Sequence, residues 1–435
     1  MAEKSSLVPS LKIFRHQGYR HYWIARQTIA CERQMVAVAI GWQVYDLARE
    51  TRSVEESAFL LGIVGLVQFF PVFLFSLVGG QAADRFDRKI ILIVSNLVRA
   101  CAIASLIAAS AVETSLALAM IFTAAGAMGM VNAFTPAASN SLYPNLVPRA
   151  ELTEAIAWNS LGFQSASIIG PAIGGFIYIA GPQTVYAVAL AMTLIAVLVF
   201  WTAQTPKHVP KGDVRGVGMI IDGLRYVRDN KIVLGAILLD LIVCFFGGVT
   251  ALLPVFARDI LHVGPAELGF MRAAPAAGAV FVGVILATRP LSRRVGPWMM
   301  GAVSIYGAAI LGFGVSSLFY LSLAMLAVAG AADMISVYVR QSLIQLATPD
   351  AMRGRVSSVS YIFIAASNEL GEFESGVAAR FLGPAGAVLL GGTVAIATAL
   401  AWFRLFPTMA RADRFDDAII ARDAPHAAEN AAAAK

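Results

Sequence analysis

Charged residues are scarce in this sequence. Asp, Glu, Lys and Arg together make up 14% of the 435 residues, whereas hydrophobic residues make up 58%. A soluble domain of this length needs more polar surface than that to cover its core. The scarcity of charge therefore argues against a soluble globular protein and predicts that the chain resides in a membrane.

Cysteine and histidine are also few. The three cysteines, Cys31, Cys101 and Cys244, are isolated from one another, so neither a disulfide framework nor a metal-ligand spacing follows from them. All five histidines lie outside the long apolar runs, and the sequence contains no Walker-type phosphate loop. We therefore expect no metal site, no cofactor and no enzymatic activity.

The net charge of +6 does not indicate a nucleic-acid partner, because the basic residues are spread through short segments between apolar runs. Twelve such runs have about 18 or more residues, the length that crosses a bilayer as a helix. With the N-terminus inside, the cytoplasmic segments hold most of the 33 Lys and Arg residues, as the positive-inside rule requires. The sequence predicts an all-α membrane protein with twelve transmembrane helices and both termini in the cytoplasm.

The predicted spans fall into two groups of six, separated by a basic stretch. The spans are expected near 22–48, 57–82, 89–110, 115–141, 151–180, 184–204, 232–257, 266–288, 297–315, 318–343, 355–381 and 384–406. We expect a cytoplasmic N-terminal segment at 1–21 and a six-helix bundle at 22–204. A cytoplasmic linker at 205–231, a second six-helix bundle at 232–406 and a disordered cytoplasmic tail at 407–435 follow.

A densely charged turn at 79–89 separates the second and third runs. Its order of glycine, aspartate and paired basic residues resembles the loop between helices 2 and 3 of the major facilitator superfamily. In that family the aspartate helps to hold the cytoplasmic side closed, and the resemblance implies this role for Asp84, with Gly80, Arg85 and Arg88 completing the gate. The alternative is a solvated loop that only sets topology. A counterpart at 288–296 keeps the basic residues but lacks the aspartate.

The fifth predicted span contains Gly170, Pro171, Gly174 and Gly175. Gly170 and Gly174 are four residues apart, so they share a helix face and permit close helix contact. The pattern resembles the motif that marks exporters and antiporters in the superfamily, with Ala166 in place of a glycine. The alternative is ordinary small-residue packing without any meaning for the direction of transport.

Three carboxylates lie within the eleventh predicted span. Glu369 and Glu372 are three residues apart and share one helix face, whereas Glu374 points elsewhere. Charge inside a membrane is costly and usually functional, and crowded carboxylates cannot all remain ionised. We expect at least one of the three to hold a proton, as a proton-coupling site must. The alternative is structural pairing with Arg340 or Arg26.

Other charged residues also fall within predicted spans. Asp333 and Arg340 are seven residues apart, which places them on one helix face and lets them flank a polar lining. The further candidates for proton coupling are Glu32, Asp240 and Asp333. The candidates for a cavity lining are Arg26, Arg33, Arg99, Arg272 and Arg340.

Three features narrow the resemblance to one branch of the superfamily. They are the end of the first span at 41–46, the motif of the fifth span, and the segment 368–376. Together they resemble the bacterial enterobactin (siderophore) exporter branch. This resemblance implies a monomeric, proton-coupled exporter of small amphipathic molecules in the bacterial inner membrane, working by alternating access. The alternatives are an importer or symporter on the same fold, and a lipid flippase or scramblase.

Overall fold

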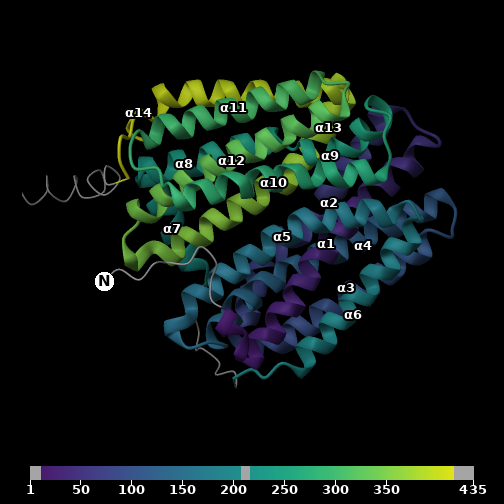
Figure 1. Ribbon diagram of the computed structural model, residues 1–435, viewed down its shortest axis with the longest axis horizontal. Coiled ribbons are helices and arrows are strands. Elements are labelled where there is room, and N and C mark those ends of the chain that lie inside the picture. The colour runs from purple at the N-terminus through teal and green to yellow at the C-terminus, as the bar shows by residue number, and fades with distance from the viewer. Residues whose placement is uncertain (1–10, 207–215, 416–435) are drawn as a thin grey trace, which may run out of the picture. The chain divides into compact units, whose positions relative to one another are not determined.

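The computed structural model describes residues 11–206 and 216–415, and all its regular elements there are helical (Figure 1). The first half contains a 3-10 turn η1 (Leu11–Arg15), α1 (Gln17–Arg49), α2 (Val54–Arg85), α3 (Arg88–Ala109), α4 (Thr114–Leu142), η2 (Tyr143–Asn145), η3 (Arg149–Glu151), α5 (Leu152–Tyr178) and α6 (Pro182–Thr202). The second half contains α7 (Gly216–Asp229), α8 (Lys231–Phe246), α9 (Val249–Val255), a π-helical turn η4 (Phe256–Ile260), α10 (Pro265–Thr288), α11 (Val295–Val315), α12 (Phe319–Ala347), α13 (Asp350–Leu405) and α14 (Pro407–Ala410).

Ten helical segments in the described part of the chain are long and apolar enough to cross a membrane. One of them, in α13, holds two of the predicted spans. α1 is long enough at 33 residues but more polar, because it carries Arg26, Glu32 and Arg33. When α1 and the second span within α13 are added to the ten, the described helices account for the twelve predicted spans. The all-α multi-pass fold is confirmed.

The two spans within α13 meet at a single residue. α13 has 56 residues, and its one non-helical residue is Gly383, with φ 74° and ψ 163°. Residues with a Cβ atom avoid this region of backbone space, so glycine is required for the reversal. Pro384 follows as the first residue of the second helical part, where its missing N–H costs nothing.

By packing, the chain divides into two compact units. The N-terminal unit contains Met1–Arg52, Leu66–Val214 and Gly264–Ala273, and the C-terminal unit contains Ser53–Gly65, Arg215–Val263 and Ala274–Lys435. The units follow the two halves of the sequence except at the starts of α2 and α10. The domain boundaries given above stay a prediction.

Two segments differ from the sequence expectation. The linker contains a helix, α7, whose Gly223 packs against the backbone of Arg355. The tail was expected to be disordered from 407, but residues 407–415 are folded, with Met409 and Ala410 buried. The expectation failed because this short segment is ordered by contacts with the C-terminal unit and not by its own composition. Residues 416–435 lie outside the described part.

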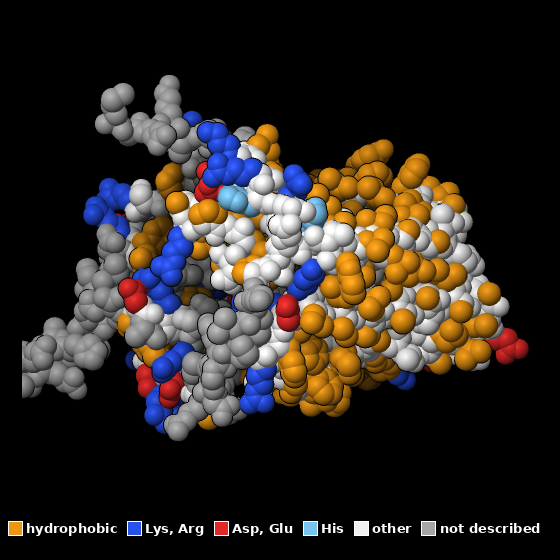
Figure 2. Space-filling model, turned by 90° about the horizontal axis from the view of Figure 1, so that it is seen from below, with side chains coloured by type: hydrophobic (Ala, Val, Ile, Leu, Met, Phe, Trp, Pro, Cys, Tyr) orange, Lys and Arg blue, Asp and Glu red, His pale blue; other side chains and the backbone are white. Residues whose placement is uncertain are grey.

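Hydrophobic side chains cover a broad band of the face drawn in Figure 2, and Lys and Arg side chains gather toward one end of it. Many large apolar residues of the helices are exposed, among them Phe73, Phe176, Leu198 and Phe281. Apolar side chains that face outward in this number are accounted for by contact with lipid.

Candidate functional site

The N-terminal unit contains a buried carboxylate–guanidinium pair. Glu32 of α1 and Arg99 of α3 are 0% and 2% exposed, and Oε2 of Glu32 lies 3.5 Å from Nη1 of Arg99. Nη2 of Arg99 also donates a hydrogen bond of 3.1 Å to Oδ1 of Asn132 on α4. Arg33, next to Glu32, is exposed. The guanidinium of Arg99 thus links α1, α3 and α4, and Arg33 is an electrostatic neighbour of Glu32.

Hydrogen bonding around this pair is incomplete. Oε1 of Glu32 and Nε of Arg99 are buried and make no hydrogen bond within the described residues. The side-chain amides of Gln27 and Asn159 in the same unit are also buried and also make no hydrogen bond within the described residues. Buried polar atoms without partners are unfavourable unless water or a bound molecule satisfies them. This region can therefore accept further hydrogen bonds from water or from a substrate.

The C-terminal unit contains a second, tighter pair. Oδ1 of Asp240 on α8 lies 2.7 Å from Nη2 of Arg340 on α12, and the two side chains are 7% and 6% exposed. Nη1 of Arg340 donates to Oγ of Ser336, and Sγ of Cys244 donates to Oδ1 of Asp240. The carboxylate and the guanidinium therefore satisfy each other and are held by neighbours on their own helices.

A further carboxylate lies near this second pair. Asp333 is exposed on α12, two turns before Arg340, and interacts electrostatically with both Arg340 and Asp240. Tyr306 of α11 is another electrostatic neighbour of Asp333 and donates a hydrogen bond to the carbonyl of Gly247. One guanidinium therefore pairs with one carboxylate and has a second in its electrostatic range, which leaves the cluster with a net negative charge when both carboxylates are ionised.

The candidate charges of the spans are unequally divided between the units. The N-terminal unit contains four arginines and one carboxylate, and the C-terminal unit contains five carboxylates and one arginine. The first set is Arg26, Arg33, Arg99, Arg272 and Glu32; the second is Asp240, Asp333, Glu369, Glu372, Glu374 and Arg340. The N-terminal unit is therefore suited to anionic groups and the C-terminal unit to protons or cations.

The carboxylates of α13 do not pair with Arg340, whose described partner is Asp240. Glu372 instead lies beside α2, where a Cβ atom added to Gly65 would come within 2.9 Å of the Cβ atom of Glu372. Glu369 and Glu372 both have interaction partners, and Glu374 is half-buried. The absence of a side chain at Gly65 is what lets α2 approach the carboxylate face of α13.

The turn between α2 and α3 is tied to other helices of its unit. Asp87 caps α3 by accepting a 2.8 Å hydrogen bond from the Lys89 amide. Arg88 donates to the carbonyl of Ser141 at the end of α4, and Lys89 donates to two carbonyls at the end of α6. Cations at helix C-termini are favourable because they satisfy unpaired carbonyls and oppose the helix dipole. Arg88 and Lys89 thus have a packing role as well as any gating role.

The remaining residues of this turn differ in their surroundings. A Cβ atom at Gly79 would lie 2.3 Å from the carbonyl oxygen of Ala133, so α2 and α4 touch there. At Gly80 an added Cβ atom would meet nothing within 4 Å among the described residues. Gly79 therefore permits close helix contact, whereas Gly80 makes no such contact among the described residues. Asp84 is half-buried, Arg85 is exposed, and both have interaction partners.

The glycines of the fifth span lie at helix crossings. Cβ atoms at Gly170 and Gly174 would come within 2.7 Å of Gln34 and Met35 on α1. A Cβ atom at Gly175 would lie 2.3 Å from the carbonyl oxygen of Pro265 at the start of α10. The motif thus packs α5 against two helices. Its bearing on the direction of transport stays a prediction.

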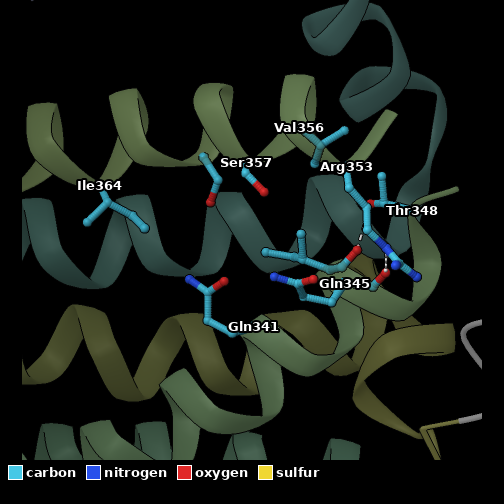
Figure 3. A pocket seen from close by; sticks show the side chains of 9 residues that line it. Gln341, Gln345, Thr348, Arg353, Val356, Ser357 and Ile364 are labelled. Atoms are coloured by element: carbon cyan, nitrogen blue, oxygen red, sulfur yellow. Dashed lines mark hydrogen bonds between the residues drawn. The ribbon is translucent and has the colours of Figure 1, made fainter. Parts of the chain in front are cut away.

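A small cavity of about 160 Å³ lies between the end of α12 and the start of α13. In Figure 3 the side chains of Gln341 and Gln345 lie between the two helices, and Arg353 donates a hydrogen bond to the carbonyl of Gln345. Its lining mixes polar and apolar groups: Gln341, Ile344, Gln345, Thr348, Arg353, Val356, Ser357, Ser360 and Ile364. Drug-sized ligands occupy roughly 300 to 1,000 Å³, so this cavity holds part of such a molecule at most.

Several of these residues were not among the sequence candidates. Asn132 and Asn159 are amides within long apolar runs, and that rarity is the signal that could have identified them. Cys244 and Ser336 carry no such signal, because small weakly polar residues are common in membrane helices. Within the described residues no group of His, Cys, Asp and Glu side chains could hold a metal ion.

Comparison with solved structures shows the fold. The chain resembles the inward-open xylose transporter XylE of E. coli, with a TM-score of 0.67, 12% identity, and coverage of 95% of this chain and 99% of that one. It also resembles a bacterial homologue of the iron transporter ferroportin in an inward-facing state. There the TM-score is 0.65 at 16% identity, over 90% of this chain and 99% of that one.

Comparison with characterised proteins shows distant kinship within one family. The enterobactin exporter EntS of Escherichia coli O1:K1 / APEC is 27% identical over 406 residues, which cover 92% of this chain and 90% of the exporter. The EntS of Shigella boydii serotype 18 is 26% identical with the same coverage. The family model described as transmembrane secretion effector (MFS_3) matches residues 8–427. The chain therefore belongs to this family of major facilitator superfamily transporters, multi-pass membrane proteins that move small molecules and are not enzymes.

Proposed function

We propose that this transporter exports small amphipathic molecules bearing anionic groups, siderophores among them, in exchange for protons. Its place is the bacterial inner membrane, with both termini in the cytoplasm. The observation that carries the proposal is the group of Asp240, Asp333 and Arg340 in the C-terminal unit, where Asp240 pairs with the guanidinium and Asp333 interacts with both electrostatically. The relationship to enterobactin exporters and the resemblance of the fifth-span motif to the exporter motif support the outward direction.

The cluster suits proton coupling because of its charge balance. Asp240 is held by Arg340 at 2.7 Å, so Asp333 is the carboxylate that is not needed to neutralise the guanidinium. A net charge within a membrane is unfavourable, and one proton on Asp333 removes it. Release of that proton restores the negative charge. Asp333 is the proton carrier of this proposal, and Asp240 with Arg340 fixes its surroundings.

The N-terminal unit suits the substrate. Arg33 is exposed beside the Glu32–Arg99 pair, and buried amide and carboxylate atoms of the same unit have hydrogen-bonding capacity to spare. Arginine binds carboxylate and phenolate oxygens through paired N–H donors. An amphipathic anion would thus place its charged groups at Arg33 and its apolar parts along the helices.

The test uses purified transporter in liposomes that contain a pH-sensitive dye and an acidic interior. Enterobactin is added outside, and both its uptake and the internal pH are followed. Exchange for protons predicts that the interior becomes more alkaline as enterobactin enters. A fall in internal pH would instead show symport, and uptake without any pH change would show uncoupled movement.

Asp333→Asn tests the residue assignment. This variant should abolish the enterobactin-dependent pH change, while Asp350→Asn, the same change at a carboxylate that is 87% exposed, should leave it intact. Glu369→Gln and Glu372→Gln are measured alongside. Loss of the pH change in either of these, with Asp333→Asn active, would move the coupling site to α13. Rapid transfer of fluorescent lipid between leaflets, without enterobactin uptake, would support a scramblase in place of an exporter.

A further inference from the structure

The loop between α10 and α11 is completed by a segment from the far end of the chain. This loop is the counterpart of the charged turn at 79–89, but its sequence contains no carboxylate. In the first turn Asp87 caps the start of α3 from within the turn itself. At the start of α11 the residues that take this place belong to 407–415, which we name the tail strap.

Three hydrogen bonds join the tail strap to the amide of Arg294, which precedes α11, and to the first two amides of the helix. The Arg294 amide donates to Oδ1 of Asp413 at 3.2 Å, the Val295 amide to the carbonyl of Asp413 at 3.3 Å, and the Gly296 amide to the carbonyl of Ala412 at 2.9 Å. The first amides of any helix have no partner within it. The strap supplies these partners, and Nε of Arg293 lies 3.7 Å from Oδ2 of Asp413.

Contacts between apolar groups hold the strap against the C-terminal unit. Met409 is 1% and Ala410 0% exposed, within a core that also includes residues of α8, α11, α12 and α13. The ring of Phe415 meets the ring of Tyr338 edge to face, with 6.0 Å between centroids. α14 packs directly against α11 (Figure 1). A four-residue helix has no stability of its own, so these contacts must order it.

Gly296 leaves space for the strap because it has no side chain. A Cβ atom there would lie 2.4 Å from the carbonyl oxygen of Met409 and 2.6 Å from that of Ala410, too close for any side chain. Arg294 adopts φ 53°, a left-handed conformation that is uncommon for residues other than glycine. Its amide is the one bound by the side chain of Asp413. An unusual backbone conformation and a required glycine thus occur together at the site of docking.

We propose that the tail strap is an integral part of the C-terminal unit, in which Asp413 supplies the capping carboxylate that the loop lacks. Asp413 is a positioning residue: it fixes the start of α11 and the backbone of Arg293 and Arg294. This proposal does not depend on the substrate, the direction of transport or the coupling ion.

The test is hydrogen exchange of the full-length protein in detergent micelles, read on peptides that cover 289–297 and 407–415. In the wild type both regions should exchange slowly; exchange of the strap amides at the rate of an unstructured chain would overturn the proposal without any variant. Asp413→Ala should speed exchange of the 289–297 peptide by roughly fivefold or more. Asp413→Asn keeps an acceptor oxygen and should restore the wild-type rate.

Arg411→Ala is the matched control, because Arg411 is an exposed residue of the same strap. It should exchange as the wild type does in both peptides. Equal rates for Asp413→Ala and the wild type would show that Asp413 does not cap α11. Acceleration in all three variants alike would show that the strap is only loosely associated, which also contradicts the proposal.

Discussion

Removal of one partner from the Asp240–Arg340 pair should destabilise the transporter more than removal of both. In Asp240→Leu the guanidinium of Arg340 stays buried, at 6% exposure, without its partner at 2.7 Å. Breaking a buried pair in this way costs about 3 to 5 kcal/mol, because an uncompensated charge remains. We expect the lower end of this range, since Asp333 lies near enough to compensate in part.

The double variant Asp240→Leu/Arg340→Met should be close to the wild type in stability. Replacement of a buried ion pair by apolar side chains of similar size is often neutral or stabilising, because the desolvation penalty of both charges disappears. We therefore expect its free energy of unfolding to lie within about 1 kcal/mol of the wild-type value. Proton-coupled transport should nevertheless be lost, which separates the stability of the fold from the function of the cluster.

Tryptophan fluorescence during denaturant titration is a suitable assay. Trp402 is 3% exposed and donates a hydrogen bond to the carbonyl of Gly235 on α8, one helix turn before Asp240, so it reports on the helix that is perturbed. The wild type, the single variants Asp240→Leu and Arg340→Met, and the double variant are compared in the same detergent. Single variants as stable as the wild type would refute the reasoning, and so would a double variant whose loss equals the sum of the two single losses.

Three further predictions concern the turn between α2 and α3. Gly79→Ala should overpack α2 against α4 and lower the free energy of unfolding by about 1 to 3 kcal/mol. Gly80→Ala should be tolerated, and thermal unfolding in detergent distinguishes the two variants. Asp87→Ala should cost about 1 kcal/mol through loss of the α3 cap, and Asp87→Asn should retain most of it, which the same measurement checks. Asp84→Asn should increase labelling of introduced cysteines from the cytoplasmic side, and unchanged labelling would remove the gating role of Asp84.

The spans could be predicted because their lengths and apolar composition are properties of continuous sequence. The shared face of Asp333 and Arg340 could be predicted in the same way, from the period of a helix. The partner of Arg340 could not, because Asp240 lies on another helix and no periodicity relates the two. Spacing within one helix pointed to Glu369 and Glu372, whereas the tighter of the two buried ion pairs described above joins α8 to α12.

The tail strap shows a second limit of sequence reasoning. Its sequence mixes charged and small residues with only two large apolar ones, Met409 and Phe415, and no periodicity predicts that it packs against a distant helix. Its order comes from the unpaired amides of α11 and from the space left by Gly296. Such order is a property of two distant segments together, so it becomes visible only when the fold brings them into contact.

The reversal at Gly383 has a consequence for how motion passes through the last two spans. A loop of several residues would absorb a displacement of one helix before it reached the next. Here one glycine separates two helical parts of a 56-residue element, so there is almost no slack between them. A displacement of the end of the part that carries Glu369 and Glu372 must therefore also displace the start of the final span, because one residue leaves the two ends no room to separate. Lengthening this joint with inserted glycines would decouple the two helices without altering any side chain inside the membrane.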